Sequence, residues 1–255
     1  MSRLLRPLGA PCRLCGRWQP EVVCHACLQV LAPLRPRCPR CALSLPAGHP
    51  TDEPCTLCED YPPEFDRAVA ALDYVAPWTT LIGRLKFDEE PALARMLGGL
   101  LAQRVAPGLQ RLRPAERPLV IPAPLSAQRL QERGYNQAEL LARTATQALR
   151  VPMLPDALVR VRHTERLMGL TADERRQAIR GAYAVRDRAL PRLRGRHVAL
   201  VDDVMTTGAT LEEMTRTLQD AGVRSVSVWV VARTPAPERP QEREGLSRSS
   251  RPLAR

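Results

Sequence analysis

The chain has 255 residues, of which 44% are hydrophobic and 25% are charged, as in soluble globular proteins with a sizeable core. No uninterrupted apolar run is long enough to span a bilayer, and residues 1–12 lack the apolar core of a signal peptide, so we expect a cytoplasmic protein without a membrane span. The formal net charge of +11 favours polyanionic partners such as nucleic acid. The alternative is that the many arginines reflect the base composition of the genome.

All eight cysteines lie in the first 58 residues, arranged as four Cys-x-x-Cys pairs. Two such pairs complete a tetrahedral four-thiolate site, so eight ligands predict one or two structural zinc ions. A disulfide framework would require an oxidising compartment, and a redox motif would need only one pair. The spacing fits sequential sites and a cross-braced arrangement equally, and His25 and His49 are not expected to be ligands. We predict a zinc-binding module over residues 1–60 with these ligands: Cys12, Cys15, Cys24, Cys27, Cys38, Cys41, Cys55 and Cys58.

Apolar periodicity predicts strands and helices through the middle of the chain. The expected elements are a strand over 67–75, helices over 81–87 and 92–105, a strand over 119–123 and a helix over 138–149. Pro107 is expected to lie in a loop. A polar loop before the last helix contains Arg129 and Arg133, whose guanidinium groups match the paired oxygens of a pyrophosphate. A solvated charged loop is the alternative for this segment.

Residues 198–211 give the most specific signal. An apolar strand leads into Asp202 and Asp203, and a hydroxyl-rich loop with one glycine precedes a helix. Carboxylates at the carboxyl end of a buried strand can accept hydrogen bonds from ribose hydroxyls. Backbone N–H groups and threonine hydroxyls at a helix N-terminus can wrap a phosphate, and the loop offers these residues: Thr206, Thr207, Gly208, Ala209 and Thr210. An ordinary acidic turn is the alternative, but the complete pattern favours a sugar-phosphate site.

The end of the chain divides into a last strand and a tail. A helix to about residue 221 and a valine-rich strand over 224–232 complete an alternation of strands and helices, which predicts a parallel sheet in an α/β domain over residues 61–233. Residues 234–255 are rich in Pro, Glu, Arg and Ser without apolar periodicity, so we expect a disordered tail.

The order of the motifs resembles the ComF family of competence-associated proteins. It runs through the four cysteine pairs, Leu85-Lys86-Phe87, residues 121–125, residues 133–137 and the loop that follows Asp202 and Asp203. The resemblance covers residues 10–233 and implies a zinc-binding segment before a type I phosphoribosyltransferase domain, an α/β fold whose parallel sheet has helices on both faces. It also implies that the two acids hold the ribose of phosphoribosyl pyrophosphate (PRPP), with magnesium, and that the following loop holds its 5′-phosphate.

The resemblance also assigns two further loops by position. Residues 123–136 correspond to the pyrophosphate loop, and residues 160–181 to a flexible loop that closes over substrate. The second segment carries the positive charge that a lid over a leaving pyrophosphate needs, in Arg160, Arg162, Arg166, Arg175, Arg176 and Arg180. This chain departs from the family pattern at Leu167, where glutamine is usual, and at Ala178, where asparagine is usual. These departures bear on catalysis more than on ligand binding.

We therefore expect a competence protein that acts in DNA uptake during natural transformation through a site for PRPP or a nucleotide phosphate. Single-stranded DNA and other competence proteins are its expected partners. The alternative is an active phosphoribosyltransferase of nucleotide metabolism, in which Asp202 and Asp203 are catalytic and pyrophosphate leaves the ribose. A transcriptional or protein-docking role for the zinc module is a third hypothesis.

Overall fold

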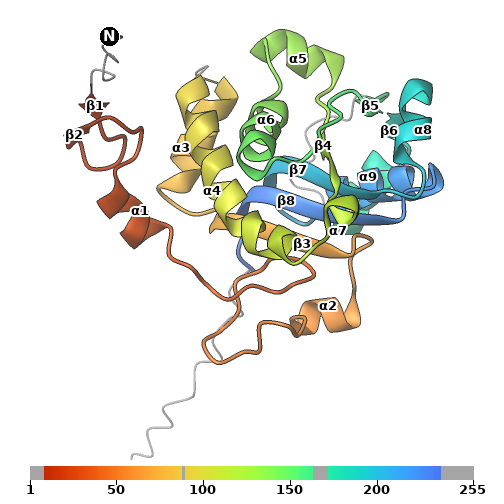
Figure 1. Ribbon diagram of the computed structural model, residues 1–255, viewed down its shortest axis with the longest axis horizontal. Coiled ribbons are helices and arrows are strands. Elements are labelled where there is room, and N and C mark those ends of the chain that lie inside the picture. Colours follow the sequence, from red (N-terminus) through yellow and green to blue (C-terminus); the bar gives the residue numbers. More distant parts are fainter. Residues whose placement is uncertain (1–8, 88–89, 163–171, 237–255) are drawn as a thin grey trace, which may run out of the picture.

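The computed structural model describes residues 9–87, 90–162 and 172–236. Its centre is a four-stranded parallel sheet with the order β3-β8-β7-β4 (Figure 1). The bounds of these strands are β3 (Arg67–Asp73), β4 (Leu119–Pro122), β7 (His197–Met205) and β8 (Ser225–Arg233). The long central strands β7 and β8 are valine-rich, as strands covered on both faces usually are, and the predicted parallel sheet is confirmed.

Helices cover both faces of the sheet, as predicted (Figure 1). One face carries α3 (Trp78–Phe87), α4 (Pro91–Gln110) and α6 (Gln137–Leu149). The other face carries α9 (Ala209–Asp220), which packs against α7 (Ala172–Ile179) and the antiparallel hairpin of β5 (Leu158–Arg160) and β6 (Tyr183–Val185). A short helix, α8 (Leu190–Leu193), precedes β7.

Side-chain alternation along β7 divides the core into two layers. Leu200 belongs to the core on the α9 side, whereas Val201 belongs to the core beneath α4 and α6. The strand continues beyond the expected end to Met205, so the same alternation applies to the paired acids, Asp202 and Asp203. Asp202 therefore points to the α9 side, and Asp203 points to the side of α3 and α6.

Helix α4 is longer than the sequence predicts. It continues through Pro107 and ends at Gln110, although proline removes one hydrogen bond from a helix interior. Val105 and Leu109, on either side of the proline, are buried in the core. Packing of these side chains holds the last turns in place despite the local cost of proline.

The expected polar loop after β4 contains a short helix, α5 (Ala127–Arg133). The Oγ of Ser126 accepts from the backbone N–H of Arg129 at 3.3 Å and caps the beginning of this helix. Gly134 ends it with φ at +73°. Ser126 and Gly134 are typical capping residues, so the sequence alone could have predicted this helix.

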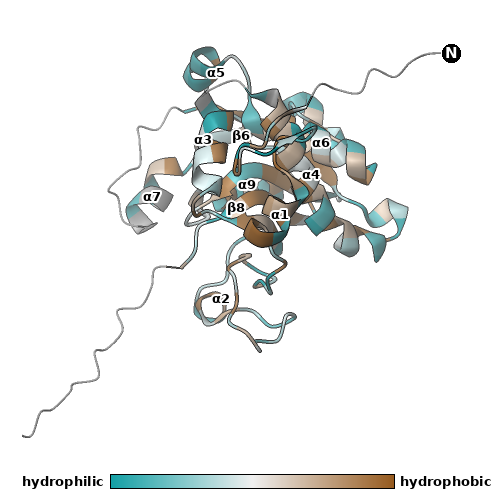
Figure 2. Cartoon of the chain, turned by 90° about the vertical axis from the view of Figure 1, so that its left-hand side faces the viewer, coloured by the Kyte–Doolittle hydropathy of each residue, from teal (hydrophilic) through white to brown (hydrophobic). Residues whose placement is uncertain are grey.

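The N-terminal part is built of short elements that lie beside and below the sheet (Figure 1). They are β1 (Ala10–Pro11), β2 (Trp18–Gln19), α1 (His25–Leu31) and α2 (Thr56–Asp60). Hydrophobic residues prevail in α1 and polar residues in α5 (Figure 2). Among the described residues, no helix combines the length and the apolar character that a bilayer crossing demands.

Candidate functional site

The paired acids lie near the carboxyl end of β7, where parallel sheets bind ligands. Asp203 is buried, and its Oδ2 atom lies 3.1 Å from the Nζ of Lys86 in α3. The same Oδ2 accepts a hydrogen bond of 3.2 Å from the Nε2 of Gln137 in α6. Two helices therefore hold the carboxylate of Asp203 in one orientation.

Asp202 has different surroundings. It is half-buried, and its Oδ1 accepts the backbone N–H of Asp203 at 2.8 Å. Burial, followed by the charge of Asp203, raises the pKa of Asp202 to about 7, and the charges of Lys86 and Arg160 oppose this rise. Asp202 is thus the acid of the pair that is best placed to exchange hydrogen bonds with a ligand.

Lys86 and Gln137 are site residues that the sequence analysis did not assign. Burial lowers the pKa of Lys86, but Asp203 outweighs burial and raises the pKa, so the ammonium stays charged beside the carboxylate. Lys86 is the only lysine in a chain with 38 lysine and arginine residues together, and this exception was a usable signal. Gln137 ends the motif that begins at Arg133, and the Tyr135 hydroxyl of this motif donates to the carbonyl of Leu85.

The Thr206–Thr210 loop follows directly and leads into α9. Gly208 has φ at +90°, which other residues rarely adopt, and allows the chain to turn into the helix. Thr206 and Thr207 are exposed, and the Oγ1 of Thr207 accepts from the N–H of Ala209 at 3.4 Å. Ala209 is the first residue of α9, so the predicted loop and helix N-terminus lie together beside the paired acids.

Arginines approach the same end of the sheet. The guanidinium of Arg160 lies 5.7 Å from the ring centre of Tyr183 in the β5–β6 hairpin. The charges of Arg160 and Arg129 favour ionisation of this tyrosine, but burial outweighs them and raises its pKa, as does the charge of Asp202. Arg129, Arg160 and Asp202 are therefore close enough to act on one side chain. Arg133 is the last residue of α5 and is half-buried.

The eight cysteines form two clusters, each with four Sγ atoms within 4.8 Å of one another. The first cluster is Cys12, Cys15, Cys24 and Cys27, and the second cluster is Cys38, Cys41, Cys55 and Cys58. The grouping is sequential, which decides between the two arrangements that the spacing allowed. Sγ separations of 3.6 Å (Cys15 to Cys24) and 3.7 Å (Cys41 to Cys55) match the edge of about 3.8 Å expected for tetrahedral zinc with Zn–S bonds of about 2.3 Å. Both clusters can therefore bind zinc.

Backbone N–H groups favour the thiolate form of one cysteine in each cluster. Burial would raise the pKa of Cys12, but N–H groups of Cys15, Cys24 and Leu14 outweigh it and lower the pKa to about 6. The pKa of Cys38 falls to about 7 for the same reason, with N–H groups from Cys55 and neighbouring residues. A metal requires such deprotonated ligands.

The phosphoribosyl transferase domain model matches residues 135–248 of this chain. The chain is 34% identical to DNA utilization protein YhgH of Salmonella typhi, over 83% of this chain and 90% of that protein. It is 39% identical to competence protein F of Haemophilus influenzae, over 70% of this chain and 78% of that protein. The chain belongs to the ComF family. A further relative is competence protein ComFC of Bacillus subtilis, 31% identical over 46% of this chain and 45% of that protein.

The structure describes only part of residues 160–181, the segment that the resemblance to the ComF family assigns to the flexible loop. Arg166, Leu167 and the side chains of Arg175 and Arg176 lie outside the described residues. At its base, the Nη2 of Arg162 donates to the carbonyl of Ala178 at 3.0 Å and to that of Arg180 at 2.5 Å. The N–H of Gly181 donates to Oε1 of Glu213 in α9 at 2.6 Å, so the end of the segment is fixed to the helix that follows the Thr206–Thr210 loop.

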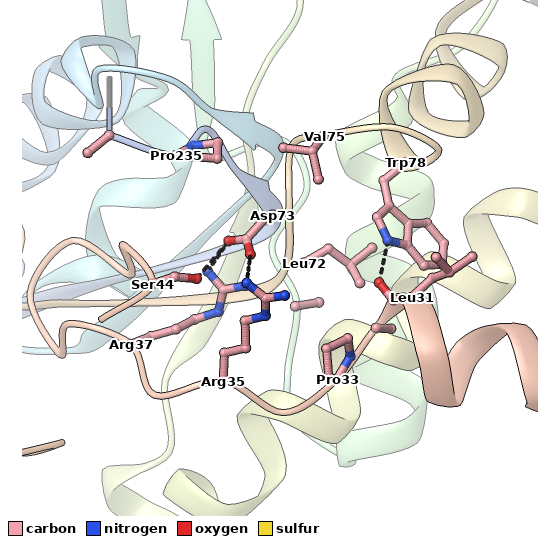
Figure 3. A pocket seen from close by; sticks show the side chains of 13 residues that line it. Leu31, Pro33, Arg35, Arg37, Ser44, Leu72, Asp73, Val75, Trp78 and Pro235 are labelled. Carbon is pink, nitrogen blue, oxygen red and sulfur yellow. Dashed lines mark hydrogen bonds and ion pairs between the residues drawn. The ribbon is translucent and has the colours of Figure 1, made fainter. Parts of the chain in front are cut away.

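The cysteine clusters of this ComF protein are fixed to its sheet domain (Figure 3). Asp73, at the end of β3, accepts from Arg37 Nη1 at 2.9 Å and from Ser44 Oγ at 2.8 Å, on either side of the first two ligands of the second cluster. The Nε1 of Trp78 donates to the carbonyl of Leu31 at 2.8 Å, just after the first cluster. These contacts border a cavity of about 250 Å³.

Proposed function

We propose that this protein acts in DNA uptake during competence through a site that binds PRPP or a nucleotide phosphate. The position of the paired acids and the Thr206–Thr210 loop, at the carboxyl end of a central parallel strand, carries the proposal. The names of the relatives refer to competence and to DNA utilization, and they supply the biological context. The net charge of +11 is suited to single-stranded DNA as a partner.

Different residues bind different parts of the ligand. Asp202, which is only half-buried, accepts hydrogen bonds from ribose hydroxyls, while Lys86 and Gln137 keep Asp203 fixed behind it. Backbone N–H groups of the Thr206–Thr210 loop bind the 5′-phosphate at the beginning of α9. Arg129, Arg133 and Arg160 supply guanidinium groups for a diphosphate.

Metals have separate roles in this proposal. One zinc ion in each cysteine cluster would stabilise the N-terminal module, because four thiolates leave no open position for catalysis. Magnesium would accompany PRPP, held mainly by the diphosphate oxygens and water. Eight thiols that serve as ligands require a reducing compartment, which supports a cytoplasmic location.

Calorimetry of PRPP with magnesium tests the ligand. We expect the wild type to bind and the double variant Asp202→Ala/Asp203→Ala to lose at least about 100-fold in affinity, since the ribose loses its acceptor Asp202 and the site loses the buried acid that pairs with Lys86 and Gln137. The control Asp156→Ala/Asp220→Ala removes two exposed carboxylates elsewhere and should bind as the wild type does. Absence of binding to the wild type would refute the assignment of the site.

An active phosphoribosyltransferase is the second candidate, favoured by Arg160, whose charge lowers the pKa of Asp202 and which can neutralise a departing diphosphate. In that reaction the C1–O bond to pyrophosphate breaks and a bond from C1 to a nucleobase nitrogen forms. Pyrophosphate release with a panel of nucleobases separates the two functions. Release that depends on Asp202 and Asp203 supports the enzyme, whereas binding without release, with transformation lost in the double variant, supports a binding role.

A further inference from the structure

Arg233, the last residue of β8, connects the second cysteine cluster with the Thr206–Thr210 loop. Its side chain is only 7% exposed. Nε donates to the carbonyl of Cys41 at 3.0 Å, and Nη1 donates to the carbonyl of Met205 at 3.1 Å and to that of Thr206. One buried guanidinium therefore joins the backbone of a cluster ligand to the backbone at the start of the loop.

These hydrogen bonds determine which way the loop presents its donors. A trans peptide holds its C=O and N–H groups on opposite sides. Because Arg233 holds the carbonyls of Met205 and Thr206, the N–H groups of Thr206 and Thr207 point away from the guanidinium. The loop thus directs consecutive N–H groups to the side opposite the cysteine cluster, which is how backbone donors converge on an anion.

Packing connects the same two regions. Ala42, next to the ligand Cys41, is fully buried in the core layer that contains Phe65 and Met205. A Cβ on Gly208 would lie 3.9 Å from a ring carbon of Phe65 and 3.8 Å from the sulfur of Met205. The turn at Gly208 therefore packs on the same core layer that buries the residue next to Cys41.

The first cluster is fixed to a different part of the domain. Arg104 in α4 donates from Nη2 to the carbonyl of Ala32 at 2.8 Å, and Trp78 donates to Leu31 (Figure 3). Neither contact involves the paired acids or the Thr206–Thr210 loop. The two arginines thus offer a comparison, because Arg104 donates to Ala32, five residues after Cys27 of the first cluster, whereas Arg233 donates to Cys41 of the second cluster.

We propose that Arg233 is a positioning residue and that metal in the second cluster, unlike metal in the first, holds the Thr206–Thr210 loop in its phosphate-binding conformation. Since such coupling is reciprocal, a bound sugar phosphate raises the affinity of the second cluster for metal. The ligand part of this inference rests on the proposed function.

Three arginine variants test the positioning role by calorimetry with ribose 5-phosphate. Arg233→Met should weaken binding about tenfold or more, within the usual range of such coupling, whereas Arg104→Met should change it less than about twofold. Arg233→Lys keeps the charge but cannot reach Cys41 and Met205 together, so it should also weaken binding while the protein remains folded. Equal affinities of wild type, Arg233→Met and Arg233→Lys would overturn the proposal.

Hydrogen exchange of the loop tests the coupling without any ligand. Cys55→Ser and Cys27→Ser each remove one half-buried thiol, from the second and the first cluster respectively. We expect faster exchange of a peptide spanning the Thr206–Thr210 loop in Cys55→Ser only, and equal exchange in both variants would overturn the coupling. If wild type fails to bind the sugar phosphate, the proposed function is wrong, and the exchange result still decides the coupling.

Discussion

Asp202 and Asp203 are adjacent in the chain but have opposite surroundings. Asp203 has a lysine and an amide as partners, so its charge is balanced inside the protein. Asp202 is desolvated and receives one backbone N–H through Oδ1. The alternation of β7 produces this division, because consecutive side chains face different layers. One acid is structural and the other remains available to a ligand.

Asp202→Asn should raise stability at neutral pH. Burial raises the pKa of Asp202 from 3.8 to about 7, so the folded state binds this proton more tightly than the unfolded chain does. Stability is therefore greatest below the unfolded value and falls as the pH rises toward the folded value. The uncharged amide removes this slope, and we expect a gain of roughly 1–3 kcal/mol at about pH 7.5.

Thermal unfolding of both proteins between about pH 5 and 8 measures this effect. The control Asp156→Asn removes an exposed carboxylate that is 3.2 Å from Arg188, and it should change stability by less than about 1 kcal/mol. An unchanged pH slope in Asp202→Asn would show that the carboxyl is already ionised in the folded protein near pH 5.

Lys86→Met should have the opposite effect on stability. It leaves Asp203 buried with an uncompensated charge, which typically costs about 3–5 kcal/mol. Urea unfolding measures the loss, and Lys86→Met/Asp203→Asn should recover part of it because the double variant buries no charge. As a control, Arg143→Met breaks an exposed pair with Glu139 and should cost less than about 1 kcal/mol. Additive costs in the double variant would contradict a direct Lys86–Asp203 interaction.

At the level of elements, the Thr206–Thr210 loop depends on one backbone conformation. Gly208 has φ at +90°, and a Cβ there would make only ordinary contacts, the nearest at 3.8 Å. We therefore expect Gly208→Ala to cost about 1–2 kcal/mol through backbone strain and to weaken phosphate binding. Gly99→Ala in α4 has open space and a helical backbone, so it should stabilise the protein by up to about 1 kcal/mol. Urea unfolding compares the two variants. If both substitutions change the free energy of unfolding in the same direction, the turn at Gly208 is not strained.

The sequence prediction of this site depended on motifs of residues that are close together in the chain. The strand, paired acids and hydroxyl-rich loop are contiguous, as are the cysteine pairs, so short-range chemistry was enough to find them. The contacts of Asp203 with Lys86 and Gln137, and those of Arg233 with Cys41 and Met205, join distant segments. These contacts depend on which helix covers which strand, and periodicity does not contain that information. The β5–β6 hairpin was missed because its strands are only three residues long.

On the scale of the whole molecule, the N-terminal module shares its core with the sheet domain. Cys12, Val23 and Cys24 are buried in the same apolar layer as Trp78 and α4. The second cluster enters the other layer through Ala42. We therefore expect loss of metal from either cluster to disturb packing in the sheet domain as well.

A strong zinc chelator should therefore destabilise the whole protein. Metal binding contributes folding energy to small cysteine-rich modules, and here the module covers buried apolar side chains of the larger domain. We expect the thermal midpoint to fall by more than about 5 °C, with recovery when zinc is restored. Trp78, which is 1% exposed, should become accessible to a fluorescence quencher, whereas Trp18 is already 70% exposed and should change little. A thermal midpoint that does not change with the chelator would show that the module folds without metal.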